Sequence, residues 1–369
     1  MFATSEVTAD KDYWWLPVPP QGEPPESHHP LTRDLSAKTC GLCHQDKYKQ
    51  WRDSIHAKAM SKGLVGQLAT TSQQNRESCL SCHSPRSEQW VAWQAAGSAA
   101  FGKVDGIDCA GCHVRAYRRF GPREVAESPH GKVEALPLFQ RSEFCMNCHQ
   151  FHGGGVSLNG KPLENTYNEW KASRYGREGR TCQSCHMPAG THGFKGIHDP
   201  EMTRQGLKVQ VIRTRQGMYV EAKNAGAGHA LPTYPTPRIT LRADTAEGGR
   251  VKQASYVIQR RLHWDPKTGW RELSDTRLLP DQSLELRLPL QEDQPATVTV
   301  IVQPDHDYHD RVYPMLLAAQ KNLSQQDRAL LEAARREGIN SKYTLYTFQC
   351  EGWTGTERPC GDGLQSGSE

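Results

Sequence analysis

Ten of the twelve cysteines in this chain of 369 residues fall into five copies of one pattern, Cys-x-x-Cys-His. Two thiols three positions apart can form thioether bonds to the two vinyl groups of one haem, and the adjacent histidine can bind the iron. The pattern therefore predicts five covalently bound haem c groups. The copies contain Cys40, Cys43 and His44; Cys79, Cys82 and His83; Cys109, Cys112 and His113; Cys145, Cys148 and His149; and Cys182, Cys185 and His186.

Zinc ribbons and redox-active disulfides are the alternatives, because both use Cys-x-x-Cys pairs. Neither requires a following histidine. Since the chain has only 16 histidines, finding one after all five pairs by chance has odds of about one in ten million. The haem interpretation is therefore favoured.

Cysteine usage also indicates a compartment. Covalent attachment of haem to cysteine is completed outside the bacterial cytoplasm, so we expect a periplasmic or extracellular protein. The N-terminus of this numbering lacks a signal-peptide pattern, and an export leader would have to lie outside it. Cys350 and Cys360 remain after the five motifs. They are predicted to form a disulfide in an oxidising environment, and two buried free thiols are the alternative.

The composition limits the remaining possibilities. Only 36% of the residues are hydrophobic, and no run approaches the roughly 18 apolar residues of a membrane span. The formal charge of +4 falls to about −1 when each ferric haem with two ionised propionates contributes about −1. We therefore expect no nucleic-acid partner. A basic cluster is expected either to pair with propionates or to form a solvated face; it contains Arg115, Arg118, Arg119 and Arg123.

The second axial position of each iron distinguishes an electron carrier from a catalyst, because a second strong ligand closes the site and an open position admits substrate. The five motif histidines leave eleven others, which are enough to close every site. They are His28, His29, His56, His130, His152, His192, His198, His229, His263, His306 and His309.

A family resemblance narrows these candidates. The stretch CGLCHQDKYKQWRDSIHAKA (40–59) resembles a signature of multihaem cytochromes related to hydroxylamine oxidoreductase and cytochrome c nitrite reductase. The resemblance implies that His56 is the distal ligand of a haem held by another motif. It extends to EWKASRYGREGRTCQSCHMP (169–188) and THGFKGIHDPEM (191–202), and so makes His192 and His198 candidate ligands. We assign a distal role also to His130 in the SPHG turn, with His152 as its substitute.

The segment NAGAGHALPT (224–233) is similar to a recurring segment at the start of the β domain in such cytochromes. The likeness implies that His229 is the distal ligand of one haem at the domain interface; a solvated loop histidine is the alternative. Gly226 and Gly228 would let the loop lie close to a macrocycle.

The chain departs from the catalytic members of the family. Cytochrome c nitrite reductases typically carry lysine in place of histidine in the catalytic motif, whereas all five motifs here end in histidine. Hydroxylamine oxidoreductases carry more haems and a tyrosine crosslink to the catalytic one. Both departures favour a carrier over an enzyme.

Three regions are expected to position these groups. Residues 1–35 form an extended proline-rich segment that either docks on the protein or is disordered. Residues 36–202 form a pentahaem domain of short helices and loops around packed haems, because about 35 residues per haem cannot bury each one separately. Residues 203–369 form an antiparallel β-sandwich-like domain with one helix over 324–337. Its strands are predicted at 207–212, 218–222, 239–243, 254–259, 284–290 and 296–302, with a hairpin turn at 213–217.

The functional prediction is a pentahaem cytochrome that relays single electrons through mostly bis-histidine haems. Its expected partners are other cytochromes or a membrane quinol-linked donor, with self-association as a further possibility. The β region offers no phosphate loop, nucleophile motif or telling carboxylate pair, and no catalytic residue is predicted. The alternatives are a reductase of a small nitrogen or sulfur oxyanion with one open haem, and a subunit of an extracellular haem filament.

Overall fold

The computed structural model describes residues 13–151, 156–247, 250–265, 267–289, 294–319 and 323–362. Internal contacts divide the chain into two compact units, each assembled from separate stretches of sequence. The first unit comprises Met1–Cys148, Arg180–Lys195 and Tyr313–Arg335, and the second comprises His149–Gly179, Gly196–Val312 and Arg336–Glu369. All ten motif cysteines therefore belong to the first unit, and the division falls inside the fourth motif, between Cys148 and His149.

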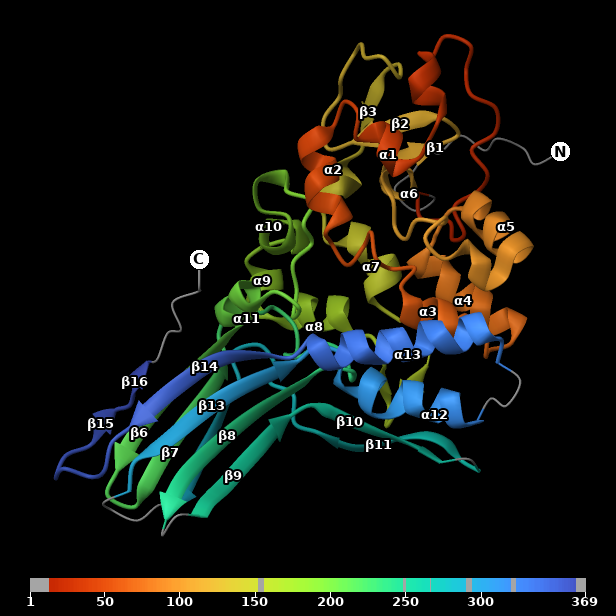
Figure 1. Cartoon of the computed structure of the whole chain (residues 1–369). Coiled ribbons are helices and arrows are strands. Elements are labelled where there is room, and N and C mark those ends of the chain that lie inside the picture. The colour runs from red at the N-terminus through yellow and green to blue at the C-terminus, as the bar shows by residue number, and fades with distance from the viewer. Residues whose placement is uncertain are drawn as a thin grey trace. The chain divides into compact units, whose positions relative to one another are not determined.

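The first unit consists of short helices with long connections between them (Figure 1), as the sequence predicted. A small sheet of β1 (Val114–Arg115), β2 (Arg118–Gly121) and β3 (Val133–Ala135) accompanies them. Helical turns η1 (Pro30–Arg33), η2 (Gly97–Ala100), η3 (Pro137–Gln140) and η4 (Pro188–Gly190) lie between them. The helices are α1 (Ala37–Cys40), α2 (Gln45–Arg52), α3 (Lys62–Leu68), α4 (Gln73–His83), α5 (Ser87–Ala96), α6 (Cys109–His113), α7 (Glu143–His149, which ends in the second unit), α10 (Cys182–His186) and α12 (Tyr313–Ala319).

Four of the five motifs are themselves helical. Helices α4, α6, α7 and α10 each end at a motif histidine, and α2 begins directly after the first motif. The reason is geometric, because residues three positions apart share one helix face, so both cysteines point the same way. The five-residue helices α6 and α10 are too short to be stable alone. Each begins with a side-chain cap, Asp108 in α6 and Thr181 in α10.

The aliphatic core of the first unit is small and divided. One cluster contains Val65, Leu68 and Leu80, a second contains Tyr13, Phe120 and Leu138, and a third contains only three buried residues, among them Ala110. Small separate clusters are what a domain needs when a prosthetic group supplies much of its interior.

The proline-rich segment docks on the first unit over its described part, as one of the two sequence alternatives expected. Tyr13 is fully buried, packs edge-on against Phe120 at 5.4 Å between ring centroids, and donates a hydrogen bond to the carbonyl of Cys112 at 2.6 Å. Val18 is also fully buried and pairs with Arg86. An aromatic anchor with a satisfied hydroxyl holds such a segment without regular secondary structure.

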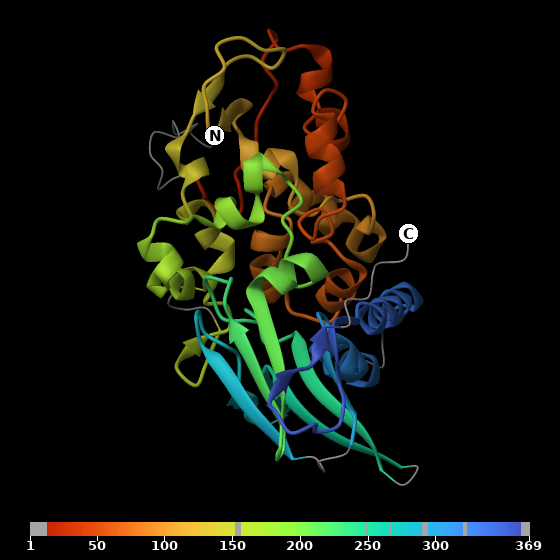
Figure 2. The same cartoon turned by 90° about the vertical axis from the view of Figure 1, so that its left-hand side faces the viewer.

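The second unit is built on two antiparallel sheets (Figures 1 and 2). Their orders are β12-β7-β6-β15 and β16-β14-β13-β8-β9, and hairpins β10-β11 and β4-β5 accompany them. The strands are β4 (Ser157–Leu158), β5 (Lys161–Pro162), β6 (Leu207–Thr214), β7 (Gly217–Asn224), β8 (Arg238–Glu247), β9 (Arg250–Ile258), β10 (Arg260–Asp265), β11 (Gly269–Asp275), β12 (Ser283–Pro289), β13 (Ala296–Gln303), β14 (Tyr343–Cys350), β15 (Arg358–Pro359) and β16 (Gly361–Asp362). Helices α8 (Thr166–Ala172), α9 (Arg174–Arg177) and α11 (Pro200–Gly206) and the π-helix Tyr308–Val312 complete the unit.

One continuous core fills this unit. It contains fully buried residues from both sheets, including Leu207, Ala222, Ile239 and Val298. All six predicted strands are therefore present, in two antiparallel sheets. The predicted helix is also present as α13 (Gln325–Asn340), but the unit division passes through it at Arg335. Its first half belongs with α3, because Leu331 packs where a side chain on Gly66 would lie.

The predicted disulfide between Cys350 and Cys360 is formed. It links the end of β14 to the chain beside β15, across a sequence separation of 10 residues. Closing a loop of this length restricts the unfolded chain, so we expect Cys350→Ser/Cys360→Ser to lower the free energy of unfolding by about 3 kcal/mol. Chemical denaturation monitored by circular dichroism in the β region measures this. An equal effect of reductant on the wild type and on the double variant would contradict it.

Candidate haem-binding sites

Four of the five motif histidines have their Nδ1 atom within hydrogen-bond distance of an acceptor. A histidine that binds a metal through Nε2 is generally held this way, because the Nδ1–H bond sets the tautomer and the ring orientation. In this arrangement Nε2 is the nitrogen that would bind a metal. The acceptors are the carbonyl of Ala59 for His83 at 3.1 Å, the carbonyl of Phe120 for His113 at 2.8 Å, the carbonyl of Lys195 for His186 at 2.7 Å, and Tyr234 and Glu164 for His149 at 2.8 and 3.1 Å.

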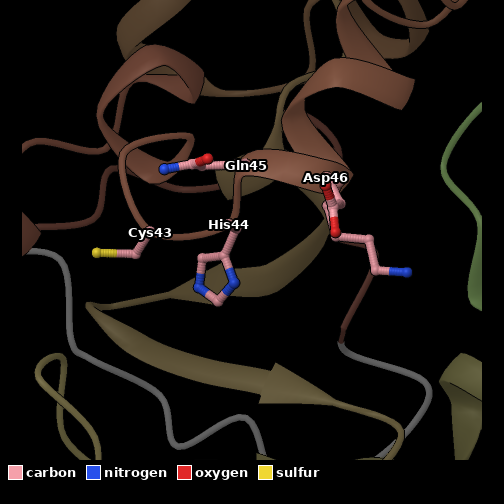
Figure 3. A pocket seen from close by; sticks show the side chains of 5 residues that line it. Cys43, His44, Gln45 and Asp46 are labelled. Carbon is pink, nitrogen blue, oxygen red and sulfur yellow. The ribbon is translucent and has the colours of Figure 1, made fainter.

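The first motif borders a cavity of about 390 Å³. Figure 3 shows Cys43, His44, Gln45 and Asp46 along its wall. The ring of His44 lies opposite the ring of His130, with centroids 6.2 Å apart and an interplanar angle of 28°. His130 comes from a turn almost ninety residues later in the chain, and only the fold brings these two rings together.

The third motif has a second pair of the same dimensions. The rings of His113 and His192 also lie 6.2 Å apart at an interplanar angle of 28°. An imidazole nitrogen binds a first-row transition metal at about 2 Å and lies about 1 Å from its ring centre, so two imidazoles on opposite sides of one iron have centres about 6 Å apart. Both pairs therefore fit a haem iron between their rings.

The two distal members of these pairs are held as firmly as the motif histidines. The Ser128 hydroxyl donates to the carbonyl of Gly131, so its oxygen accepts from Nδ1 of His130 at 2.7 Å. Nδ1 of His192 donates to the carbonyl of Gly190 at 3.0 Å. In both histidines Nε2 is therefore the nitrogen that would bind a metal.

Burial keeps these imidazoles in the neutral form that binds metals. Desolvation lowers the pKa of His113 to about 4, and the neighbouring charge of His192 contributes to the shift. Desolvation also lowers the pKa of His130 and of His192. A neutral imidazole releases no proton when it coordinates, which favours iron binding near neutral pH.

The other distal candidates differ in their surroundings. The ring of His56 lies 4.2 Å from the ring of Phe194. His198 presents Nε2 to the Asp305 carboxylate at 3.0 Å, so the nitrogen that would bind iron is already engaged. His152 lies outside the described residues.

The loop that carries His229 is built to hold one conformation. Buried Asn224 donates to the carbonyl of His229 at 2.8 Å, and the Glu169 carboxylate accepts from the backbone of Ala230 at 2.9 Å. Nδ1 of His229 contacts the carbonyl of Ala230 at 3.0 Å. Gly226 also serves chain packing, because a side chain there would collide with the backbone of Gln205.

The motif cysteines of different haem sites are neighbours in the first unit. A hydrogen bond between the thiols of Cys40 and Cys109 lowers the pKa of Cys40. A similar bond to Cys182 raises the pKa of Cys145, and the charge of Cys112 adds to that increase. These contacts make the cysteines of the first and third motifs neighbours, and likewise those of the third, fourth and fifth.

The arginines of the basic cluster make different contacts. Arg118 forms an ion pair with Glu134, and Arg119 donates to the carbonyl of Thr32. Arg115 is only 4% exposed, and within the described ranges its Nη2 is a buried donor with no hydrogen-bond partner, as is Nε1 of Trp14. The Arg115 guanidinium lies over the Trp14 ring at 5.1 Å. A negatively charged acceptor such as a haem propionate would satisfy two such buried hydrogen-bond donors that lie near each other.

A buried ion pair supports the third motif. The carboxylate of Asp108 accepts from the backbone of Gly111 at 2.7 Å, inside the motif, and from Arg86 at 2.6 Å. The Asp108 side chain is fully buried. We expect Asp108→Ala to destabilise the protein by about 3 kcal/mol or more, because it leaves the arginine buried without its partner. Glu134→Ala, which breaks the half-exposed pair with Arg118, is the matched control and should cost less than about 1 kcal/mol.

Thermal unfolding of the two variants measures the difference. Equal losses in the two variants would show that Asp108 does not support the motif.

A zinc ribbon would gather four cysteine or histidine side chains around one point. Among the described residues, no group of three or more histidine, cysteine, aspartate or glutamate side chains could hold a metal ion in this way.

The helices of the described chain include none that is both long and apolar enough to cross a membrane.

Comparisons with known proteins agree with this chemistry. Residues 39–114, which hold the first three motifs, match the family model of cytochrome c554 and c-prime. The fold is similar to the crystal structure of a penta-heme cytochrome c552 from Thermochromatium tepidum, with 19% sequence identity, a TM-score of 0.57, and coverage of 90% of this chain and 100% of that one. A comparison with curated proteins gave no significant match.

The motifs, the paired imidazoles and the family match define a class of protein, the c-type cytochromes. The chain is a multihaem c-type cytochrome that resembles the cytochrome c554 family over residues 39–114. Covalent haem c and electron transfer follow from membership of this class, and electron transfer implies redox partner proteins.

Proposed function

We propose that the protein is an exported pentahaem cytochrome that relays single electrons through closely spaced, mostly bis-histidine haems. The observation that carries the proposal is the pair of facing imidazoles at His44–His130 and His113–His192, each with centroids 6.2 Å apart. Sites closed on both sides of the iron suit electron transfer, because no position is left for a substrate.

The axial ligands are assigned from the facing imidazole rings and from the atoms that the ring nitrogens contact. His130 pairs with His44, and His192 pairs with His113. We prefer His192 to His198 because Nε2 of His198 contacts a carboxylate. His56 and His229 remain the proposed distal ligands of further haems, and the ordered loop around His229 supports its assignment.

Electron transfer would not follow the order of the motifs in the sequence. The neighbouring thiols support a series from the first motif to the third, fourth and fifth. Bound haem iron supplies the one-electron chemistry by cycling between its ferric and ferrous states. The protein contributes axial nitrogens, neutral imidazoles, and the buried donors of Arg115 and Trp14 for a propionate.

The disulfide Cys350–Cys360 supports a location in an oxidising compartment, periplasmic or extracellular. There the partners would be other cytochromes or a membrane quinol-linked donor.

Electronic spectra of the oxidised and reduced holoprotein test the proposal. We expect low-spin ferric haem and no spectral response to nitrite, sulfite, hydroxylamine or carbon monoxide. A high-spin component that binds one of these ligands would overturn the proposal for that site and favour a reductase with one open haem.

A further inference from the structure

The fourth motif differs from the others in what its histidine contacts. Nδ1 of His83, His113 and His186 each contacts a backbone carbonyl. Nδ1 of His149 instead contacts two side chains, the Glu164 carboxylate at 3.1 Å and the Tyr234 hydroxyl at 2.8 Å. A carboxylate carries a full negative charge, whereas a carbonyl carries only a partial one.

The three side chains form a connected group within the second unit. Tyr234 and Glu164 both approach Nδ1 of His149, and all three residues belong to this unit. The Nδ1–H of His149 donates to the tyrosine oxygen and to the carboxylate, so Nε2 is the nitrogen that would bind the iron.

The charge of Glu164 is not neutralised by a basic side chain. Its side chain is 15% exposed, and no lysine or arginine in the described part of the chain forms an ion pair with it. Other carboxylates of this unit, such as Glu272 and Asp275, are paired with Lys161. Glu164 can therefore act on His149 with little screening by solvent or counter-charge.

We infer that Glu164, together with Tyr234, positions His149 and lowers the reduction potential of the haem bound by the fourth motif. The inference rests on the proposed function. A carboxylate bound to the outer nitrogen makes the imidazole a stronger donor. Ferric iron carries one more positive charge than ferrous iron, so a stronger donor and a nearby negative charge both stabilise the ferric state. Hydrogen bonding, net charge and axial ligation are the means by which a protein sets the potential of its haem.

The lowered reduction potential would make the fourth haem a low-potential site within the series of neighbouring motifs. Cys145 of the same motif is the neighbour of Cys182 and is influenced by Cys112. The fourth haem would therefore stand between the third and fifth with a potential lowered by Glu164.

A redox titration of Glu164→Gln tests this inference. Glutamine keeps the shape and an acceptor oxygen but removes the charge. We expect one of the five midpoint potentials to rise so that the ferrous form is favoured about tenfold, which is about 59 mV for a one-electron couple. The other four midpoints should be unchanged, and the haem should remain low-spin. A variant that replaces Cys145 and Cys148 with serine lacks the fourth haem, so the wild-type midpoint that it loses identifies the one expected to move.

Two further variants complete the design. Glu178→Gln removes an exposed carboxylate of the same unit and should leave all five midpoints in place. Tyr234→Phe should raise the same midpoint by less, since it removes one acceptor and keeps the charge; it also tests the inference if Glu164→Gln fails to mature.

The possible failures are distinguishable. A wild-type protein with fewer than five haems refutes the proposed function itself. Five haems with equal shifts in Glu164→Gln and Glu178→Gln, or with no shift in either, overturn the role of Glu164 alone. A shift in a midpoint that survives the loss of the fourth haem also overturns it.

Discussion

Denaturing mass spectrometry of the mature protein is expected to give the mass of the chain plus five haem groups. The physical reason is that each Cys-x-x-Cys pair can form two thioether bonds, which survive unfolding, whereas coordinated zinc or non-covalent haem is lost. A variant with Cys182 and Cys185 both replaced by serine should carry four haems. Absorbance of the alkaline pyridine complex provides an independent count.

The matched control is Cys350→Ser/Cys360→Ser, which removes two cysteines that belong to no motif and should retain all five haems. A fully matured wild type with fewer haems, or with stoichiometric zinc, would contradict the assignment of the motifs.

Replacing His130 or His192 with alanine is expected to convert one of the five haems from low spin to high spin. Each histidine faces a motif histidine across 6.2 Å, and alanine offers no nitrogen to the iron. The vacated position should then bind carbon monoxide in the ferrous protein, one equivalent for each variant and two for the double variant. Magnetic resonance of the ferric protein and carbon monoxide titration measure these changes.

His198→Ala is the matched control. It removes a half-exposed histidine of the same short stretch, but one whose Nε2 contacts Asp305. Its five haems should stay low-spin. If His198→Ala gives the high-spin haem and His192→Ala does not, the two assignments must be exchanged.

Several elements could be predicted because their signals are local. The strands β6, β7, β8 and β13 follow from alternating apolar residues, which bury one face wherever the strand pairs. Strand β14 has a comparable pattern of tyrosine, leucine and phenylalanine but was not anticipated, and the hairpin β10-β11 was also missed. The motif helices could not be predicted, because spacing suited to thioether chemistry is also the spacing of one helix face and a pattern of five residues is too short to reveal a helix.

The sequence by itself determined the covalent chemistry of the cysteines, because that chemistry depends on residues close together in the chain. A thioether pair and its adjacent histidine need only five consecutive residues, so five haem sites and the disulfide partners could be inferred without a fold. The tertiary structure decided which imidazoles face each other, because His44 and His130 are far apart in the chain and no local rule relates them. It also decided that the third motif adjoins the first, and that Glu164 and Tyr234 hold His149. These relations depend on how distant segments pack, and packing is a property of the whole chain rather than of any one stretch.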